Sequence, residues 1–135
     1  MKLNPDCIRA ILLYLEENQK IDSSNGKMKP LPWASHLPET ITEFSAEDVV
    51  YSVKQMSESG LIDTRPIRAD GMIDYIFNDI TPYGHEFLEN IRAEENWSKT
   101  KNVATKLGNF SLSALEKIAE GVTTAAINKM LGLSQ

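Results

Sequence analysis

The sequence predicts an α+β fold in which a two-stranded ribbon lies between two helices, and three observations support this. An amphipathic helix is expected over residues 46 to 59, because Ser45 is a good N-cap and apolar residues follow at helical spacing. Gly60 then ends the helix, and two runs rich in β-forming residues fill positions 61 to 80. Thr81, followed by proline, starts another helix directly afterwards. This order is typical of a winged helix, or winged helix-turn-helix-like, domain.

The helix at residues 46 to 59 has an apolar side and a polar side. The side expected to be buried carries Ala46, Val49, Val50, Val53, Met56, Ser57 and Gly60, and the opposite side carries Glu47, Asp48, Tyr51, Gln55 and Glu58. The apolar side is expected to pack on the core. The polar side would then face solvent or a partner.

The ribbon is expected as two strands over residues 61 to 65 and 72 to 80. A polar bend at residues 66 to 71 joins them, and Asp70 followed by Gly71 favours a tight turn there. β-branched and aromatic residues on both sides favour antiparallel pairing. This ribbon would be the wing.

The first 44 residues are expected to supply one helix and one strand. Asn4, with proline after it, starts a helix that runs to about Glu17. Residues 18 to 30 are polar and rich in turn formers, so they predict a loop. Residues 31 to 37 predict a short edge strand that pairs with the wing. Residues 38 to 44 are compatible with one helical turn or with more strand.

Beyond residue 81 the sequence predicts helices only, with a bend or a break near Glu95. Gly108 ends one helix and Ser111 caps the last one. The last helix has an apolar side formed by Leu112, Leu115, Ile118, Ala119, Val122, Ala126 and Met130. The expected organisation is a winged-helix domain over residues 1–94 and a C-terminal helical extension over residues 95–135.

The charge of the chain is uneven. The 135 residues have a net charge of −5 and a pI of about 5.0. Residues 1–80 hold 8 Lys and Arg against 13 Asp and Glu, whereas residues 97–135 hold 5 Lys against 2 Glu. Since electrostatic attraction supplies most non-specific affinity for nucleic acids, an acidic domain is a poor generic DNA binder.

The sequence offers no pattern for catalysis. Cys7 is the only cysteine, and His36 and His85 are distant from each other in the sequence, so neither a disulfide nor a metal site is expected. Phosphate-binding glycine loops and nucleophile motifs are also missing. We therefore expect a non-enzymatic protein with no catalytic residue and no cofactor. The start lacks a secretion signal and no apolar run is long enough for a bilayer, so we expect a cytoplasmic protein with no membrane span.

Five stretches carry a resemblance to a known family. They are Lys2–Arg9, Ser45–Met56 with Gly60-Leu-Ile62, Ile80–Arg92 and Trp97–Lys99. Together they resemble a bacterial and prophage family of uncharacterised winged-helix proteins, over roughly residues 2 to 107. The resemblance implies a winged-helix architecture but no activity that could be carried over to particular residues.

The winged-helix prediction leads to two functional hypotheses. The first is a DNA-associated protein that regulates transcription, with contacts from Tyr51, Ser52, Lys54, Gln55, Arg65 and Arg68. Glu47, Asp48 and Glu58 lie on the same side of the helix and would repel the DNA backbone. The alternative is a protein-protein interaction module, with a phage or host partner, that uses the same scaffold and binds no nucleic acid.

The last helix predicts self-association. If its apolar side stayed in water it would forgo the favourable free energy of burial, so another surface should cover it. The residues of this side expected to make the self-association contact are Leu115, Ile118, Val122 and Met130. A homodimer is expected, and docking of the helix on its own domain is the alternative.

Overall fold

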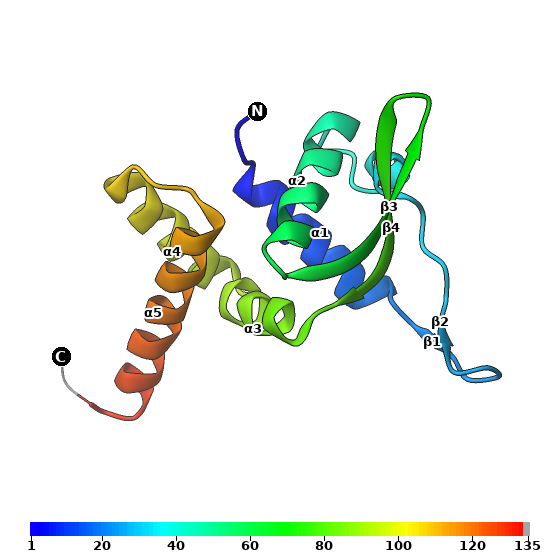
Figure 1. The fold of residues 1–135 in the computed structure, drawn as a ribbon. Helices are drawn as coiled ribbons and strands as arrows, with labels where there is room; N and C mark the ends of the chain where they lie inside the picture. Colours follow the sequence, from blue (N-terminus) through cyan, green and yellow to red (C-terminus); the bar gives the residue numbers. More distant parts are fainter. Residues whose placement is uncertain (134–135) are drawn as a thin grey trace. The chain divides into compact units, whose positions relative to one another are not determined.

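The computed structural model describes residues 1–133 and shows an α+β architecture of helices and two small antiparallel sheets (Figure 1). The chain divides into two compact units, Met1–His85 and the residues from Glu86 on. The first unit contains α1 (Pro5–Asn18), β1 (Ile21–Asp22), β2 (Lys27–Met28), the 3₁₀ helix η1 (Ala34–Glu39), α2 (Ala46–Glu58), β3 (Ile62–Ala69), β4 (Met72–Ile80) and the start of α3 (Pro82–Ile91). The second contains the rest of α3, α4 (Glu94–Leu107) and α5 (Leu112–Met130). The α+β prediction is confirmed, and the first unit is compatible with a winged-helix-like fold.

The core of the first unit is formed by α1, η1 and α2 together with the ribbon, which contributes Ile62, Tyr75, Phe77 and Ile80. Helix α1 begins where predicted, because the Asn4 side chain accepts a hydrogen bond from the Cys7 amide at 3.2 Å and proline occupies the first helical position. The apolar stripe of α1 is buried as predicted, and η1 and α2 add further buried side chains. These are Cys7, Ile8, Ile11, Leu12, Leu15, Ala34, Leu37, Val49, Val53 and Met56.

Helix α2 has the predicted ends. The Ser45 hydroxyl accepts a hydrogen bond from the Asp48 amide at 3.1 Å, and Gly60 has a φ of 82° just beyond the helix. The buried side is rotated relative to the prediction, because Ser52 is buried to 1% exposure whereas Ala46 is exposed. Ser52 lies between Val49 and Met56 at helical spacing, and its small side chain fits into the core beside α1.

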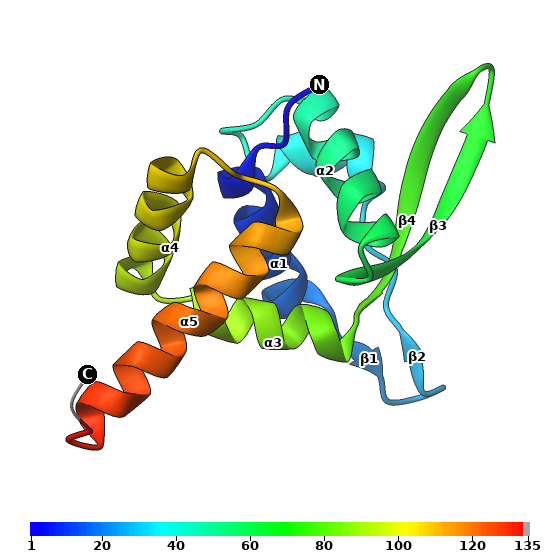
Figure 2. The same cartoon turned by 60° about the vertical axis from the view of Figure 1, so that its left-hand side comes forward.

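Strands β3 and β4 form a ribbon that projects past α2 (Figure 2). Asp70 and Gly71 have positive φ angles of 52° and 75° and join the paired residues Ala69 and Met72, which makes a tight two-residue turn. The predicted ribbon is confirmed, but the predicted bend over residues 66 to 71 is wrong. Strand β3 continues through Pro66 to Ala69, because Pro66 lies on a strand with no neighbour on its outer edge.

Thr81 joins the ribbon to α3. Its hydroxyl donates to the carbonyl of Gly60 at 2.5 Å or of Leu61 at 3.0 Å, and accepts from the Gly84 amide at 3.0 Å. The end of α2, the start of β3 and the first turn of α3 are thus tied to one side chain. This hydrogen bonding gives a physical reason for Thr-x-x-Gly at this point of the sequence.

Two predictions for residues 18 to 37 are wrong. The expected loop contains a short hairpin in which Ile21 pairs with Met28, and the turn is stabilised by a hydrogen bond from Gly26 to the Asp22 carbonyl at 2.8 Å. The expected edge strand at residues 31 to 37 is replaced largely by η1. Within residues 1–133 both sheets are two-stranded, so neither gains a third strand from this segment.

The second unit contains the helical hairpin of α4 and α5, which pack on each other. The predicted interruption is present, at Arg92 and Ala93 rather than near Glu95. Gly108, with a φ of 65°, ends α4, and the Ser111 hydroxyl caps α5 by accepting from the Ala114 amide at 3.1 Å. The compact units divide after His85, inside α3, whereas the sequence placed the boundary after residue 94.

Candidate interaction site

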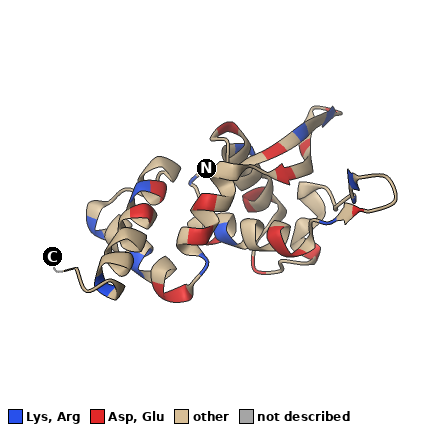
Figure 3. Cartoon of the chain, turned by 90° about the horizontal axis from the view of Figure 1, so that it is seen from below, with Lys and Arg blue, Asp and Glu red and all other residues tan. Residues whose placement is uncertain are grey.

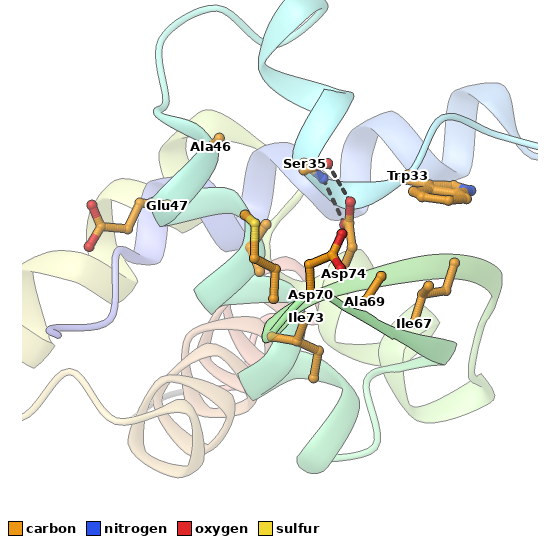
Figure 4. Close-up of a pocket in the computed structure, with 11 residues that line it drawn as sticks. Trp33, Ser35, Ala46, Glu47, Ile67, Ala69, Asp70, Ile73 and Asp74 are labelled. Carbon is orange, nitrogen blue, oxygen red and sulfur yellow. Dashed lines mark hydrogen bonds between the residues drawn. The ribbon is translucent and has the colours of Figure 1, made fainter.

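The first unit has a groove between the N-terminal turns of α2 and the ribbon, with a volume of about 480 Å³. We call it the α2–ribbon groove. Its apolar lining side chains come from Trp33 just before η1 and from α2, β3 and β4, and its ionisable lining side chains are all acidic. The lining residues are Trp33, Ser35, Ala46, Glu47, Val50, Ile67, Ala69, Asp70, Met72, Ile73 and Asp74. Figure 4 shows Glu47 and Trp33 at opposite ends, with Ile67, Ala69 and Ile73 along the ribbon.

Asp74 holds one wall of the groove in place. One of its carboxylate oxygens accepts from the Ser35 amide at 3.0 Å and from the Tyr75 amide at 2.8 Å, and the other accepts from the Ser35 hydroxyl (Figure 4). The Ser35 amide belongs to the first turn of η1, where backbone donors lack partners and a carboxylate is favourable. The capture of this amide by Asp74 also explains why residues 31 to 37 do not pair as a strand.

Several apolar side chains of the groove reach solvent. Trp33 is 45% exposed and Met72 is 75% exposed. The ring of Trp33 is held in place by His36, on which it packs edge-to-face with the ring centres 6.4 Å apart. Large apolar side chains that are exposed beside a concave surface commonly indicate a binding site.

Comparisons with known proteins place the chain in a family. The model of the DUF2513 family, described as a hypothetical protein, matches residues 2–110. The chain belongs to the DUF2513 family. An "Uncharacterized protein" of Haemophilus influenzae strain Rd is 31% identical over 123 residues, which cover 90% of this chain and 95% of that protein. No solved structure matches the chain.

The residues that match the DUF2513 model indicate which part of the fold is common to the family. Its residues 2–110 include every lining residue of the α2–ribbon groove and end before α5 begins. The groove therefore lies in the part of the chain that defines DUF2513.

The residues predicted to contact DNA fall into three groups in this DUF2513 protein. Ser52 is buried next to Cys7, so it cannot reach a ligand and its assignment is wrong. Tyr51, Lys54 and Gln55 are half-buried on α2. Arg65 and Arg68 are exposed on β3.

The charges around these candidates are mixed. The ammonium of Lys54 forms an ion pair with Glu58 at 3.0 Å, and this hydrogen bond raises the pKa of Lys54 above its ordinary value. Burial raises the pKa of Tyr75, and the nearby charges of Lys54 and Arg68 oppose that shift. The first unit as a whole carries 8 Lys and Arg against 13 Asp and Glu (Figure 3). The side of α2 that would face DNA is thus not a basic surface.

The residues predicted for self-association differ in how far they are buried. Leu115 is fully buried and Ile118 and Val122 are half-buried, so they belong at least partly to the packing of α5. The burial of Leu115 within the unit in which α5 packs on α4 leaves this self-association candidate no surface for a second copy. Met130 is 89% exposed and remains a candidate.

The described part of the chain gives no sign of a metal centre or a membrane span. Among residues 1–133 no three His, Cys, Asp or Glu side chains lie close enough together to hold a metal ion. Within the same residues no helix is long and apolar enough to cross a bilayer.

The sequence reasoning missed the groove. The sequence places Asp74 in the strand predicted over residues 72 to 80, and Trp33 and Ser35 in the predicted edge strand, with no link between them. Ser35, two residues after Trp33 and three before Pro38, has no acceptor for its amide nearby in the sequence, and its partner Asp74 lies 39 residues away. Nothing local in the sequence connects the two.

Proposed function

We propose that this DUF2513 protein is a non-enzymatic protein-interaction module built on a winged-helix scaffold. The α2–ribbon groove receives a protein segment that carries apolar side chains and a basic residue. The observation that carries this proposal is the lining of the groove, which combines exposed apolar side chains with three acids, Glu47, Asp70 and Asp74, and includes no Lys or Arg.

The apolar lining supplies the free energy for binding. Fully covering a large apolar side chain contributes about 1.5–3 kcal/mol, and Met72 is mostly exposed. Trp33 adds a flat aromatic surface, and aromatic residues are enriched among the side chains that dominate protein interfaces. A groove already shaped by Asp74 and Ser35 needs little reordering when a segment binds.

The acids define the chemistry of the partner. Asp74 is already hydrogen-bonded within the unit, so Glu47 and Asp70, both exposed, are the groups available to a ligand. Complementary charge accelerates association and selects against acidic partners. A segment with Lys or Arg next to apolar side chains fits this rim, whereas the phosphates of DNA do not.

A peptide-display selection tests the proposal. Random peptides are selected on the protein and counter-selected on the variant Met72→Glu, which places a charge on an exposed groove position. We expect enrichment of peptides with apolar residues next to Lys or Arg. The matched control is Arg65→Glu, an exposed position on the same ribbon outside the groove lining, which should retain the selected peptides. Selected peptides that bind Met72→Glu as well as they bind Arg65→Glu would contradict the proposal. A selection that enriches no peptide would also contradict it.

A second candidate is a DNA-associated regulatory protein, and one specific observation favours it. Arg65 and Arg68 are exposed, and neither forms an ion pair with any residue in the described range 1–133. Arginines on the wing could contact phosphates or the minor groove, with Tyr51, Lys54 and Gln55 on the adjacent helix.

Salt dependence separates this candidate from the first. DNA binding through these arginines should weaken steeply as salt rises, because counterions are released from the phosphates. A gel-shift titration at about 50 mM salt, with Arg65→Glu and Arg68→Glu in one chain as the comparison, measures it. No shift with tens of micromolar protein would exclude the DNA candidate.

A further inference from the structure

The C-terminal turn of α5 exposes a group of apolar side chains. Ile127, Met130, Leu131 and Leu133 are 49%, 89%, 68% and 56% exposed. We call these four residues the α5 apolar end. Apolar side chains gathered in this way on a surface commonly mark an interaction site.

The α5 apolar end is ordered by its own backbone. Gly132, with a φ of 75°, follows the helix, and the Leu133 amide donates to the Asn128 carbonyl at 2.8 Å. The Gly132 amide donates to the Lys129 carbonyl at 3.2 Å, which completes the hydrogen-bond pair of a Schellman motif. This motif turns the residue after the glycine back onto the last helical turns. The backbone of this segment therefore has little conformational entropy left to lose when the group docks.

The charge near the α5 apolar end matches the α2–ribbon groove. Residues 121–133 contain one ionisable side chain, Lys129, and no acid. The groove is lined by three acids and no basic residue. An apolar surface next to a single ammonium is the kind of ligand that the lining of the groove favours.

We propose that the α5 apolar end of one copy of this chain docks into the α2–ribbon groove of a second copy. The exchange is reciprocal, because each chain has one groove and one α5 apolar end, and two identical contacts close a symmetric dimer. Lys129 is placed at the acidic rim of Glu47 and Asp70. This inference rests on the proposed function and names the partner of the same groove.

The groove has room for this ligand. Its volume of about 480 Å³ lies within the roughly 300–1,000 Å³ of pockets that hold compact ligands. The reciprocal arrangement also buries two grooves and two helix ends at once. A single contact of this size would be weak, whereas two contacts add their buried areas in one association step.

Mixing two variants provides the decisive test. Met72→Glu damages the groove and leaves the α5 apolar end intact, whereas Met130→Glu does the reverse. Both positions are exposed, and circular dichroism checks that both chains stay folded. Sedimentation velocity should show a dimer for the unchanged protein, with dimerisation weakened about tenfold or more in each variant. The equimolar mixture should associate more tightly than either variant alone and more weakly than the unchanged protein, because one of its two contacts joins an intact groove to an intact α5 apolar end.

Two controls sharpen the test. Lys117→Glu changes an exposed charge on α5 away from its end and should leave dimerisation unchanged. Leu133→Glu is a second variant of the α5 apolar end and should act as Met130→Glu does. An unchanged protein that is monomeric at about 500 µM overturns the inference, and so does a mixture that associates no more tightly than either variant alone. Monomers in all samples would leave docking of α5 within its own chain as the remaining alternative.

A peptide separates this inference from the proposed function. An amidated, fluorescein-labelled peptide of residues 121–133 should bind the unchanged protein in an anisotropy titration, and about tenfold more weakly when Lys129 is replaced by glutamate. If display-selected peptides bind the groove but this peptide does not, the second copy is the wrong partner and the proposed function stands. If neither binds, both fail.

Discussion

Gly84 lies in the first turn of α3 against the backbone of Leu61, and replacing it with alanine should destabilise the first unit. A Cβ atom at position 84 would lie 1.9 Å from the Leu61 carbonyl oxygen and 2.9 Å from the Cγ2 atom of Ile80. Ordinary contact begins at about 3.4 Å, so the first atom cannot stay where it is. The obstacle is backbone, which cannot rotate away as a side chain can.

The loss of stability caused by Gly84→Ala can be estimated from the contacts that must change. Separating α3 from Leu61 strains or breaks the hydrogen bonds of Thr81, which are worth about 1 kcal/mol each, and overpacking adds about 1–3 kcal/mol. Alanine is the better helix former by about 1 kcal/mol, which offsets part of this. The expected net loss is about 2–4 kcal/mol in the free energy of unfolding of the first unit.

Amide hydrogen exchange measures this loss, because it reports the α1 and α2 core separately from α5. The matched control is Gly121→Ala, inside α5, where an added Cβ would meet no atom within 4 Å. That change should stabilise α5 by about 0.5–1 kcal/mol. If Gly84→Ala left the protection of the core unchanged, the proposed close contact between α3 and Leu61 would be refuted.

Three further predictions concern single groups of the first unit. Asp74→Ala should lower the free energy of unfolding by about 1–3 kcal/mol in urea titrations, because it leaves donors of η1 and β4 without their acceptor, and unchanged stability would contradict that role. Burial raises the pKa of Cys7 and of Tyr75, so the folded state holds these protons more tightly than the unfolded chain. The stabilisation that the protonated forms of these two groups give the folded state is fully present at neutral pH. The free energy of unfolding should fall as pH rises above about 9, and the fall should be shallower for Cys7→Ala in the same titration. Lys54→Ala should leave stability nearly unchanged in the same assay, because its ion pair with Glu58 is exposed, and a clear loss of stability would show a further contact.

Local signals in the sequence predicted most of the helices and the ribbon. The caps at Asn4, Ser45 and Ser111 and the Asp70-Gly71 turn each depend on neighbours within a few residues, so their structure can be inferred from the sequence around them. Periodicity likewise predicted the buried side of α1.

The groove could not be predicted in this way. It depends on the hydrogen bonds between Asp74 and Ser35, which are 39 residues apart, and on η1, a short element whose composition resembles an edge strand. The buried position of Ser52 was missed because polarity was used to assign it to the outer side of α2. Packing against α1 decides its environment, and a small hydroxyl fits there.

The central claim is that the α2–ribbon groove binds a protein segment, and amide chemical-shift mapping tests it most directly. The 15.1 kDa chain is suitable for this method, and its two tryptophans supply separate indole signals from Trp33 in the groove and from buried Trp97. Adding a display-selected peptide to the ¹⁵N-labelled protein should shift the Trp33 indole and the amides of residues 46–50 and 67–74, and leave the Trp97 indole in place. Shifts confined to residues 62–66 around Arg65 with an unmoved Trp33 indole, or no shifts with saturating peptide, would contradict the account.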